Sequence, residues 1–183
     1  MHQHAVCRHV PRGAEDEAAR GLTEEAAAHG VAVTTFTADG LVVGVCDGAE
    51  PASVAGAEPM HVVIERTAGA GGSLHAIRYP IRDGMTDIAE QVFRGSGDPP
   101  LTAGTTRLLR TWVYRKDSLL VRVFAIDGDV DELVEGLARA VEVHDVGRRM
   151  GALFVGSYDF TDREGLRAFF RDNLMRAGQA VPA

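Results

Sequence analysis

The sequence is poor in cysteine, in long apolar runs and in basic charge. Two cysteines in 183 residues are too few for a disulfide framework, which makes a reducing cytoplasm the simplest expected location. No run of eighteen apolar residues occurs, so we expect no membrane-spanning helix. Lysine and arginine number 19 against 26 acidic residues, a formal net charge of -7, which argues against nucleic-acid binding. The composition predicts an acidic, globular, cytoplasmic protein.

Hydrophobic periodicity predicts an α+β chain. Alternating, β-branched segments predict strands at 3–10, 31–37, 41–46, 60–67, 73–81, 105–115, 118–127 and 151–158. Helical spacing predicts helices at 14–29, 84–94, 129–145 and 161–176.

An internal repeat organises these elements. The segment starting at His4 resembles the one starting at His75, an offset of 71, and the segment at Phe36 resembles the one at Tyr114, an offset of 78. Each half follows the β-α-β-β-(α)-β order of ferredoxin-like domains. We therefore predict two ferredoxin-like repeats fused in one chain, a degenerate one at 1–68 and a second at 73–178. Their antiparallel sheets are expected to face each other, as in a dimeric α/β barrel, and to enclose a cavity.

The hairpin at 108–128, "LLRTWVYRKDSLLVRVFAIDG", carries unusual side chains for a plain core strand pair. A three-residue turn at 116–118 would place Trp112 opposite Arg122 and Tyr114 opposite Leu120. On that register six side chains point toward the cavity: Arg78, Arg110, Trp112, Tyr114, Arg122 and Phe124. The alternate, uniformly apolar residues are expected under the helices: Leu119, Val121, Val123 and Ala125.

This face is predicted to be a pocket wall, because a buried arginine requires an anionic partner. A bound enolate, phenolate or carboxylate would supply it. Arg122 and Arg110 are the candidate catalytic residues, and the candidate substrate-binding residues are Trp112, Tyr114, Arg78 and Phe124. The first half has smaller residues at the aligned positions, including Gly44 for Arg122. The alternative is that the arginines reach solvent at a sheet edge and the aromatic rings are core.

Two further groups of residues have candidate roles. His144 and Asp145 could form a general base with its orienting carboxylate, or His144 could simply end the apolar stripe of its helix. The histidines and cysteine near the N-terminus, at positions 2, 4, 7 and 9, lack a recognised metal-ligand spacing. We expect no metal and no cofactor.

The second half resembles the SchA/CurD-like domain of actinobacterial aromatic polyketide clusters, including those for spore pigments. The resemblance is carried by "YPIRDGMTDIAEQVF", by "TWVYRKDSLLVRVFAIDGDVDELVEGLARAVEVHDVGRR" and by "DREGLRAFFRDNLM", within residues 73–176. The segment "RRMGALFVGSYDF" departs from the family pattern, and the first 70 residues match only through the repeat. More distantly, the chain resembles ferredoxin-like polyketide cyclases and cofactor-free monooxygenases.

The resemblance implies a role in aromatic polyketide biosynthesis. The first hypothesis is a cyclase that stabilises enolates of a poly-β-keto or partly cyclised intermediate, either free or bound to an acyl carrier protein. The second is a cofactor-independent monooxygenase that forms quinones from anthrone-like polyketides. The third is a non-catalytic partner of the synthase complex. Whether the chain forms a homodimer stays open.

Overall fold

The computed structural model describes residues 3–48, 56–96 and 102–178. The chain divides into two compact units, unit 1 (residues 1–62 and 175–183) and unit 2 (residues 63–174). Each unit combines an antiparallel sheet with helices, so the predicted α+β class is confirmed. The assignment of residues 1–68 and 73–178 as two repeats with facing sheets stays a prediction.

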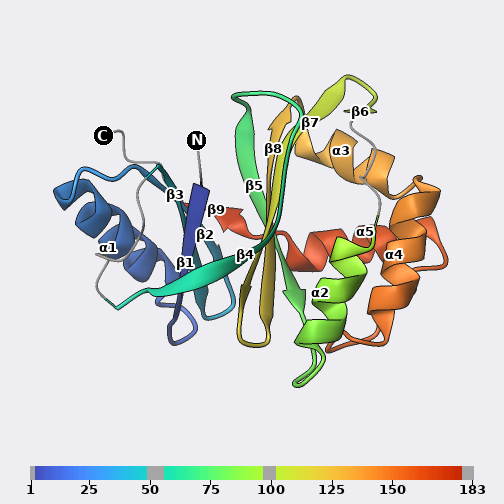
Figure 1. The fold of residues 1–183 in the computed structure, drawn as a ribbon, viewed down its shortest axis with the longest axis horizontal. Helices are drawn as coiled ribbons and strands as arrows, with labels where there is room; N and C mark the ends of the chain where they lie inside the picture. Colours follow the sequence, from blue (N-terminus) through green and yellow to red (C-terminus); the bar gives the residue numbers. More distant parts are fainter. Residues whose placement is uncertain (1–2, 49–55, 97–101, 179–183) are drawn as a thin grey trace. The chain divides into compact units, whose positions relative to one another are not determined.

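Unit 1 is an antiparallel sheet with α1 on one face (Figure 1). Its elements are β1 (Gln3–His9), α1 (Glu15–Ala28), β2 (Val33–Ala38), β3 (Leu41–Asp47), the first half of β4 (Glu58–Thr67) and β9 (Arg176–Ala177). The strand order is β4-β1-β3-β2-β9, so the last strand of the chain pairs with β2. Leu22 and Ala19 of α1 pack on Val6 and Val42 of the sheet.

The start of α1 is tied to the β2–β3 hairpin by one carboxylate. Glu15 accepts hydrogen bonds from the backbone N–H groups of Gly40, at 2.6 Å, and of Gly13, at 2.7 Å. The bond from Gly40 is the largest cause that lowers the pKa of Glu15. Gly40 and Asp39 form the two-residue turn with positive φ angles of 76° and 24°, as tight hairpins require.

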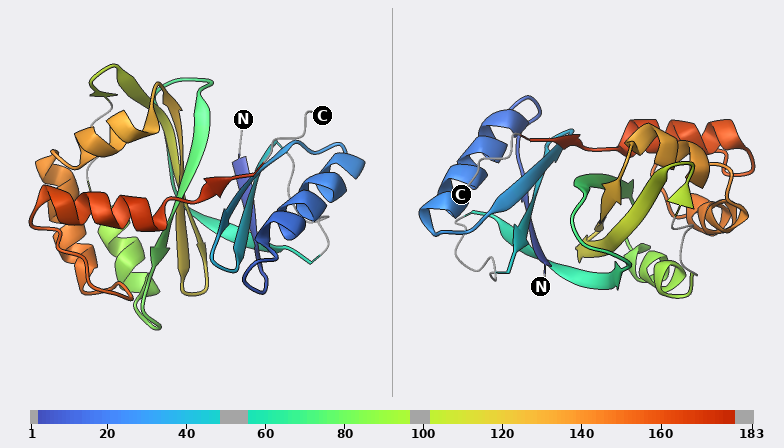
Figure 2. Two further views of the ribbon diagram at one scale, coloured as in Figure 1. Left: turned by 180° about the vertical axis from the view of Figure 1, so that it is seen from behind. Right: turned by 90° about the horizontal axis from the view of Figure 1, so that it is seen from above.

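Unit 2 is an antiparallel sheet whose helices all pack on one face (Figures 1 and 2). Its strands are the second half of β4, β5 (Ser73–Pro80), β6 (Thr102–Ala103), β7 (Thr106–Lys116) and β8 (Leu119–Asp127). Its helices are α2 (Thr86–Arg94), α3 (Val130–Leu137), α4 (Val141–Gly151) and α5 (Arg163–Asn173). The main strand order is β5-β8-β7-β4, with β6 pairing β7. One core cluster joins all these helices to the sheet through residues such as Phe93, Leu133, Met150 and Phe169.

The β7–β8 hairpin differs from the predicted register by one residue. Lys116 pairs with Leu119, so the turn contains only Asp117 and Ser118, and Asp117 adopts a positive φ of 50°. Trp112 therefore lies opposite Val123 instead of Arg122, and Tyr114 lies opposite Val121 instead of Leu120. A one-residue change moves every side chain of one strand to the other face relative to its partner.

The prediction for the faces of β8 was also wrong. The residues that pack with the helices are Leu120, Phe124 and Ile126, in alternation with Arg122. Val121 and Val123 lie on the opposite face, although both are fully buried. Because both faces of β8 are buried and apolar, hydrophobic alternation could not indicate which face the helices cover.

The region after β8 departs twice from the predicted elements. The single helix expected at 129–145 is two helices, α3 and α4, separated at Ala138–Ala140. The strand expected at 151–158 is absent from the described residues: Phe154 makes one bridge to Ile81 and then packs its ring against Phe160 and Phe169. Two residues later, Gly156 adopts a positive φ of 103°, which is incompatible with a continuing strand. The aromatic core therefore prevails over strand propensity here.

None of the helices in the described part of the chain is long and apolar enough to cross a membrane. Within residues 3–48, 56–96 and 102–178, no group of three or more histidine, cysteine, aspartate or glutamate side chains could hold a metal ion. His2, one of the N-terminal histidines considered above, lies outside the described residues.

Candidate functional site

The structure separates the predicted site residues into two sets on opposite faces of the unit 2 sheet. Arg78, Arg110, Trp112 and Tyr114 lie on the face away from the helices, with Val121 and Val123. Arg122 and Phe124 lie on the face that the helices cover. The predicted grouping of the first four is correct, whereas placing Arg122 and Phe124 with them was wrong because of the register of the hairpin.

A pocket lies between the helices and the sheet of unit 2, with Arg122 in its wall. Its cavity volume is about 80 Å³, several times the roughly 10–15 Å³ that one water requires. The lining is mostly apolar, and six aromatic rings contribute to it: Tyr79, Phe93, Phe154, Phe160, Phe169 and Phe170. Such a pocket, with few polar groups in an aromatic lining, is typical of a small-molecule site.

The aromatic rings of this pocket form one packed cluster. Tyr79 meets Phe93 edge-on with ring centroids 4.9 Å apart, and Phe154 stacks on Phe169 at 5.1 Å. Phe169 also contacts Tyr79 at 5.6 Å and Phe160 at 5.4 Å. Edge-on and stacked ring pairs at these separations stabilise one another, so the lining of the pocket is a preorganised surface.

Arg122 is positioned by polar neighbours on the adjacent strands. Its Nε donates a hydrogen bond to Thr111 Oγ1 on β7 at 2.8 Å. The guanidinium also interacts with the hydroxyl of Tyr79, which is 7% exposed on β5. Burial raises the pKa of Tyr79, and the charge of Arg122 and its hydrogen bond partly oppose that rise. Tyr79 is therefore a neutral phenol at physiological pH, able to donate a proton or a hydrogen bond.

The mouth of the pocket carries the remaining polar groups. Arg66 on β4 lines it and donates to the carbonyl oxygen of Ser96 at 3.1 Å. Arg149 on α4 holds the hydroxyl of the same serine at 3.0 Å. Glu142 on α4 is the acidic side chain among the lining residues. The pocket thus places a cation in an apolar interior and both charge signs at its opening.

The helix-free face holds the other predicted residues in a different environment. Arg110 Nε donates to the carbonyl oxygen of Gly69 at 2.8 Å, so this arginine is anchored by backbone. Trp112 is 1% exposed, and its indole N–H has no acceptor among the described residues. A substrate role for Arg78, Trp112 and Tyr114 stays a prediction.

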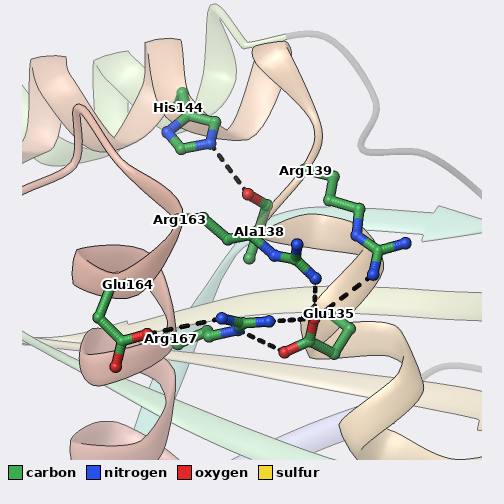
Figure 3. A network of polar contacts seen from close by, with 7 residues as sticks. All are labelled: Glu135, Ala138, Arg139, His144, Arg163, Glu164 and Arg167. Atoms are coloured by element: carbon green, nitrogen blue, oxygen red, sulfur yellow. Dashed lines mark hydrogen bonds and ion pairs between the residues drawn. The ribbon is translucent and has the colours of Figure 1, made fainter.

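His144 is held by two backbone carbonyl groups. Its Nδ1 lies 2.9 Å from the oxygen of Phe160, and its Nε2 lies 3.0 Å from the oxygen of Ala138 at the end of α3 (Figure 3). Asp145 forms its ion pair with Arg148. The ring of His144 therefore links the α3–α4 connection to the segment before α5, which is a structural use of both nitrogens. The predicted general-base role remains a prediction without support from these contacts.

An ion-pair network fastens α3 to α5 beside this link. Glu135 on α3 accepts hydrogen bonds from Arg163 and Arg167 on α5, and Arg139 lies 3.7 Å away (Figure 3). The bonds from Arg167 and Arg163 lower the pKa of Glu135 from 4.5 to about 2. The network holds the helices that carry Leu137, Phe169 and Phe170 of the pocket lining.

Sequence reasoning missed Tyr79, Thr111 and Glu142 as candidate site residues. Tyr79 and Thr111 can be recognised as neighbours of Arg122 only when the pairing register of β8 with β5 and β7 is known, since that register places all three on the helix-covered face. Tyr79 stands within the quoted segment "YPIRDGMTDIAEQVF", but as one aromatic residue among apolar neighbours it carried no separate signal.

Two solved structures overlap most of the chain at TM-scores of 0.47: a candidate monooxygenase from Lactobacillus acidophilus (8% identical, covering 85% of this chain and 90% of that one) and one from Fusobacterium nucleatum (11% identical, covering 84% and 87%). Polyketide synthase CurD of Streptomyces cyaneus is 30% identical over 110 residues. The aligned part is 60% of this chain and 30% of that relative, so the chain spans less than a third of its length.

The family profile described as SchA/CurD like domain matches residues 73–182. These residues include β5, the helices of unit 2 and the lining of the Arg122 pocket except Ile64 and Arg66. The match covers more than half of the sequence, and the chain belongs to the SchA/CurD-like domain family.

Proposed function

We propose that unit 2 is an aromatic polyketide cyclase, with the pocket around Arg122 as its site. The observation that carries the proposal is a single arginine held by Thr111 and Tyr79 inside a lining of aromatic rings. Membership of the SchA/CurD-like family, and the similarity to a protein named polyketide synthase CurD, support a polyketide intermediate as the ligand.

The arrangement suits ring closure between an enolate carbon and a carbonyl carbon. Arg122 stabilises the enolate oxygen, since a cation in a partly buried, mostly apolar site interacts more strongly with developing negative charge than it would in water. Tyr79, neutral because burial raises its pKa, gives its proton to the alkoxide that forms on the attacked carbonyl. Glu142 at the mouth takes the proton of the carbon acid, and solvent restores both groups.

The size of the pocket limits what enters it. A cavity of about 80 Å³ lined by rings receives the ring-closing end of the chain, while the rest of the intermediate extends through the mouth past Arg66. This leaves room for an intermediate that is free or attached to an acyl carrier protein. The two-repeat origin of the units and a homodimer are further parts of the hypothesis that this site does not require.

The test follows ring closure of a synthetic poly-β-keto N-acetylcysteamine thioester by absorbance and by the loss of water in mass spectrometry. We expect the wild-type protein to accelerate closure and Arg122→Met to lower kcat/KM by roughly 10²–10³-fold. Arg107→Met is the matched control, because Arg107 is exposed and pairs with Asp127 away from the pocket.

Two other results would replace the cyclase by an alternative. Oxygen consumption with 1,8-dihydroxyanthrone that depends on Arg122 would indicate a cofactor-independent monooxygenase. Binding of the thioester without acceleration in either assay would indicate a non-catalytic partner of the synthase.

A further inference from the structure

Unit 1 contains a second recess whose lining is polar. It lies between α1 and the sheet edge formed by β2 and β9, and its volume is about 430 Å³. Helix α1 packs on β1 and β3 through Leu22 and Ala19, and on β2 through Ala26, which contacts Val33. The recess lies between the N-terminal part of α1 and the strands β2 and β9.

Three threonines form the inner wall of this recess. Thr23 comes from α1, and Thr35 and Thr37 come from β2. Their exposed fractions are 3%, 1% and 2%. The hydroxyl of Thr23 donates to the carbonyl oxygen of Ala19 at 2.9 Å, which leaves its oxygen lone pairs available.

The hydroxyls of Thr35 and Thr37 make no hydrogen bond to another described residue, and neither oxygen is among the fully buried atoms that lack a partner, so both are accessible from the recess. The hydrogen bond of Gly178 is to the carbonyl oxygen of Thr35. Both side chains line the recess, so their hydroxyl groups can donate to water or to a ligand that occupies it.

The charge at the rim indicates which kind of molecule fits. The sequence of unit 1 contains four arginines and no lysine, and two of these arginines, Arg20 and Arg176, line this recess. Asp16 pairs with Arg176 at 3.2 Å, which leaves an excess of one positive charge. Guanidinium groups with neighbouring hydroxyls suit a carboxylate or phosphate group.

We propose that the recess of unit 1 binds a small ligand through an oxyanion group, a carboxylate or a phosphate. Thr35 and Thr37 donate to its oxygens, Arg20 and Arg176 supply the charge, and the oxygen of Thr23 accepts from any hydroxyl that the ligand carries. This site is formed entirely by unit 1 residues and does not depend on the proposed activity of unit 2.

The test measures the binding of inorganic phosphate and, separately, of acetate by calorimetry and thermal unfolding, against sodium chloride at equal ionic strength. We expect one of the two to bind saturably to the intact chain and to raise Tm. Replacing both threonines (Thr35→Val with Thr37→Val) keeps the β-branched shape and should weaken binding by about tenfold for each lost hydrogen bond. Arg20→Gln, on the exposed rim, should weaken it without affecting folding.

Arg12→Gln is the matched control, because Arg12 is an exposed arginine of the same unit that does not line the recess. Saturable phosphate binding that is lost in the threonine and Arg20 variants supports a phosphate ligand, and the same result with acetate supports a carboxylate. Absence of saturable binding for both probes, or binding that the threonine and Arg20 variants leave unchanged, would overturn the proposal.

Discussion

The two units differ in what occupies the space between helix and sheet. In unit 1 the position aligned with Arg122 is Gly44, where a Cβ atom would lie 2.8 Å from Leu22 Cδ2 and 3.1 Å from Val33 Cγ2. The absence of a side chain lets α1 pack directly on the sheet. In unit 2 Arg122 stands at that position and lines a pocket. At this one position the helix contacts the sheet directly in unit 1, whereas in unit 2 the aligned residue lines a pocket.

The units are otherwise matched in strand pairing. In unit 1 His4 pairs with Cys46, and in unit 2 His75 pairs with Phe124. The two histidines are 71 positions apart in the sequence, and their two partners are 78 positions apart. Both β-hairpins also turn through two residues, with an aspartate of positive φ first. These registers follow the offsets of the sequence repeat and are consistent with the proposed duplication. Equal backbone pairing with different side chains shows that the pocket arises from the side chains and the added helices.

The edges of the two sheets extend the comparison. In each unit the lining of the recess includes an arginine from the sheet, Arg66 on β4 in unit 2 and Arg176 on β9 in unit 1. The position of Val113 in unit 2 corresponds to Thr35 in unit 1 by the 78-residue offset. The unit 2 pocket therefore has an apolar valine side chain where the unit 1 recess has a threonine hydroxyl group, so the two recesses suit different ligands.

The largest effect is expected for Gly44→Arg, which gives unit 1 the residue of unit 2. The side chain would have to displace Leu22 and bury a charge without a partner, so the free energy of unfolding should fall by about 3–5 kcal/mol. Urea denaturation followed by circular dichroism measures this change. Gly44→Ala should cost about 1–3 kcal/mol, because its Cβ alone already crowds Leu22. A wild-type denaturation midpoint for Gly44→Arg would show that α1 does not pack on this glycine.

Removing the hydroxyl group of Tyr79 tests whether this group gives a proton to the substrate in the Arg122 pocket of unit 2. Tyr79→Phe should lower kcat for ring closure roughly tenfold and leave KM nearly unchanged, since the hydroxyl acts on charge that develops during the reaction. Tyr158→Phe is the control, because Tyr158 packs on Phe169 but does not line the pocket. An unchanged kcat with a raised KM would assign the hydroxyl of Tyr79 to substrate binding alone.

The smallest effect on stability is expected for loss of the ion-pair network around Glu135, which joins α3 to α5. The described residues of unit 1 contain no helices that correspond to α3 and α5. The folded-state pKa of Glu135, about 2, lies below its ordinary value of 4.5. The pair therefore contributes stability above about pH 4.5 and loses that contribution as the pH falls toward 2. Because the network is on the surface, the contribution is small and screened by salt.

Urea midpoints of the wild-type protein and Glu135→Gln should differ above pH 4.5 and converge near pH 2. Glu164→Gln is a milder control, since Glu164 contacts Arg167 only at 3.5 Å. A difference between wild-type and Glu135→Gln midpoints that stays constant from pH 2 to 5 would show that Glu135 does not titrate in that range.

Most elements could be predicted from the sequence because their periodicity is local. The strands that became β1, β5 and β8 and the helices that became α1 and α5 lie within a few residues of their predicted bounds. The residues between α3 and α4, Ala138–Ala140, include no proline or glycine that would have predicted the break, and the carbonyl group of Ala138 contacts His144. The strand predicted around Phe154 does not form, because the ring of Phe154 packs in an aromatic cluster with Phe160 and Phe169. Such contacts are invisible to any local pattern.

The sequence by itself determined the α+β class and the family, because these depend on periodicity and on motifs that the sequence carries. The tertiary structure alone decided that Arg122 meets Tyr79 and Thr111 while Trp112 and Arg110 lie on the other face. The physical reason is that β8 is apolar and buried on both faces, so a two-residue turn and the packing of the helices chose the face that the alternation left ambiguous.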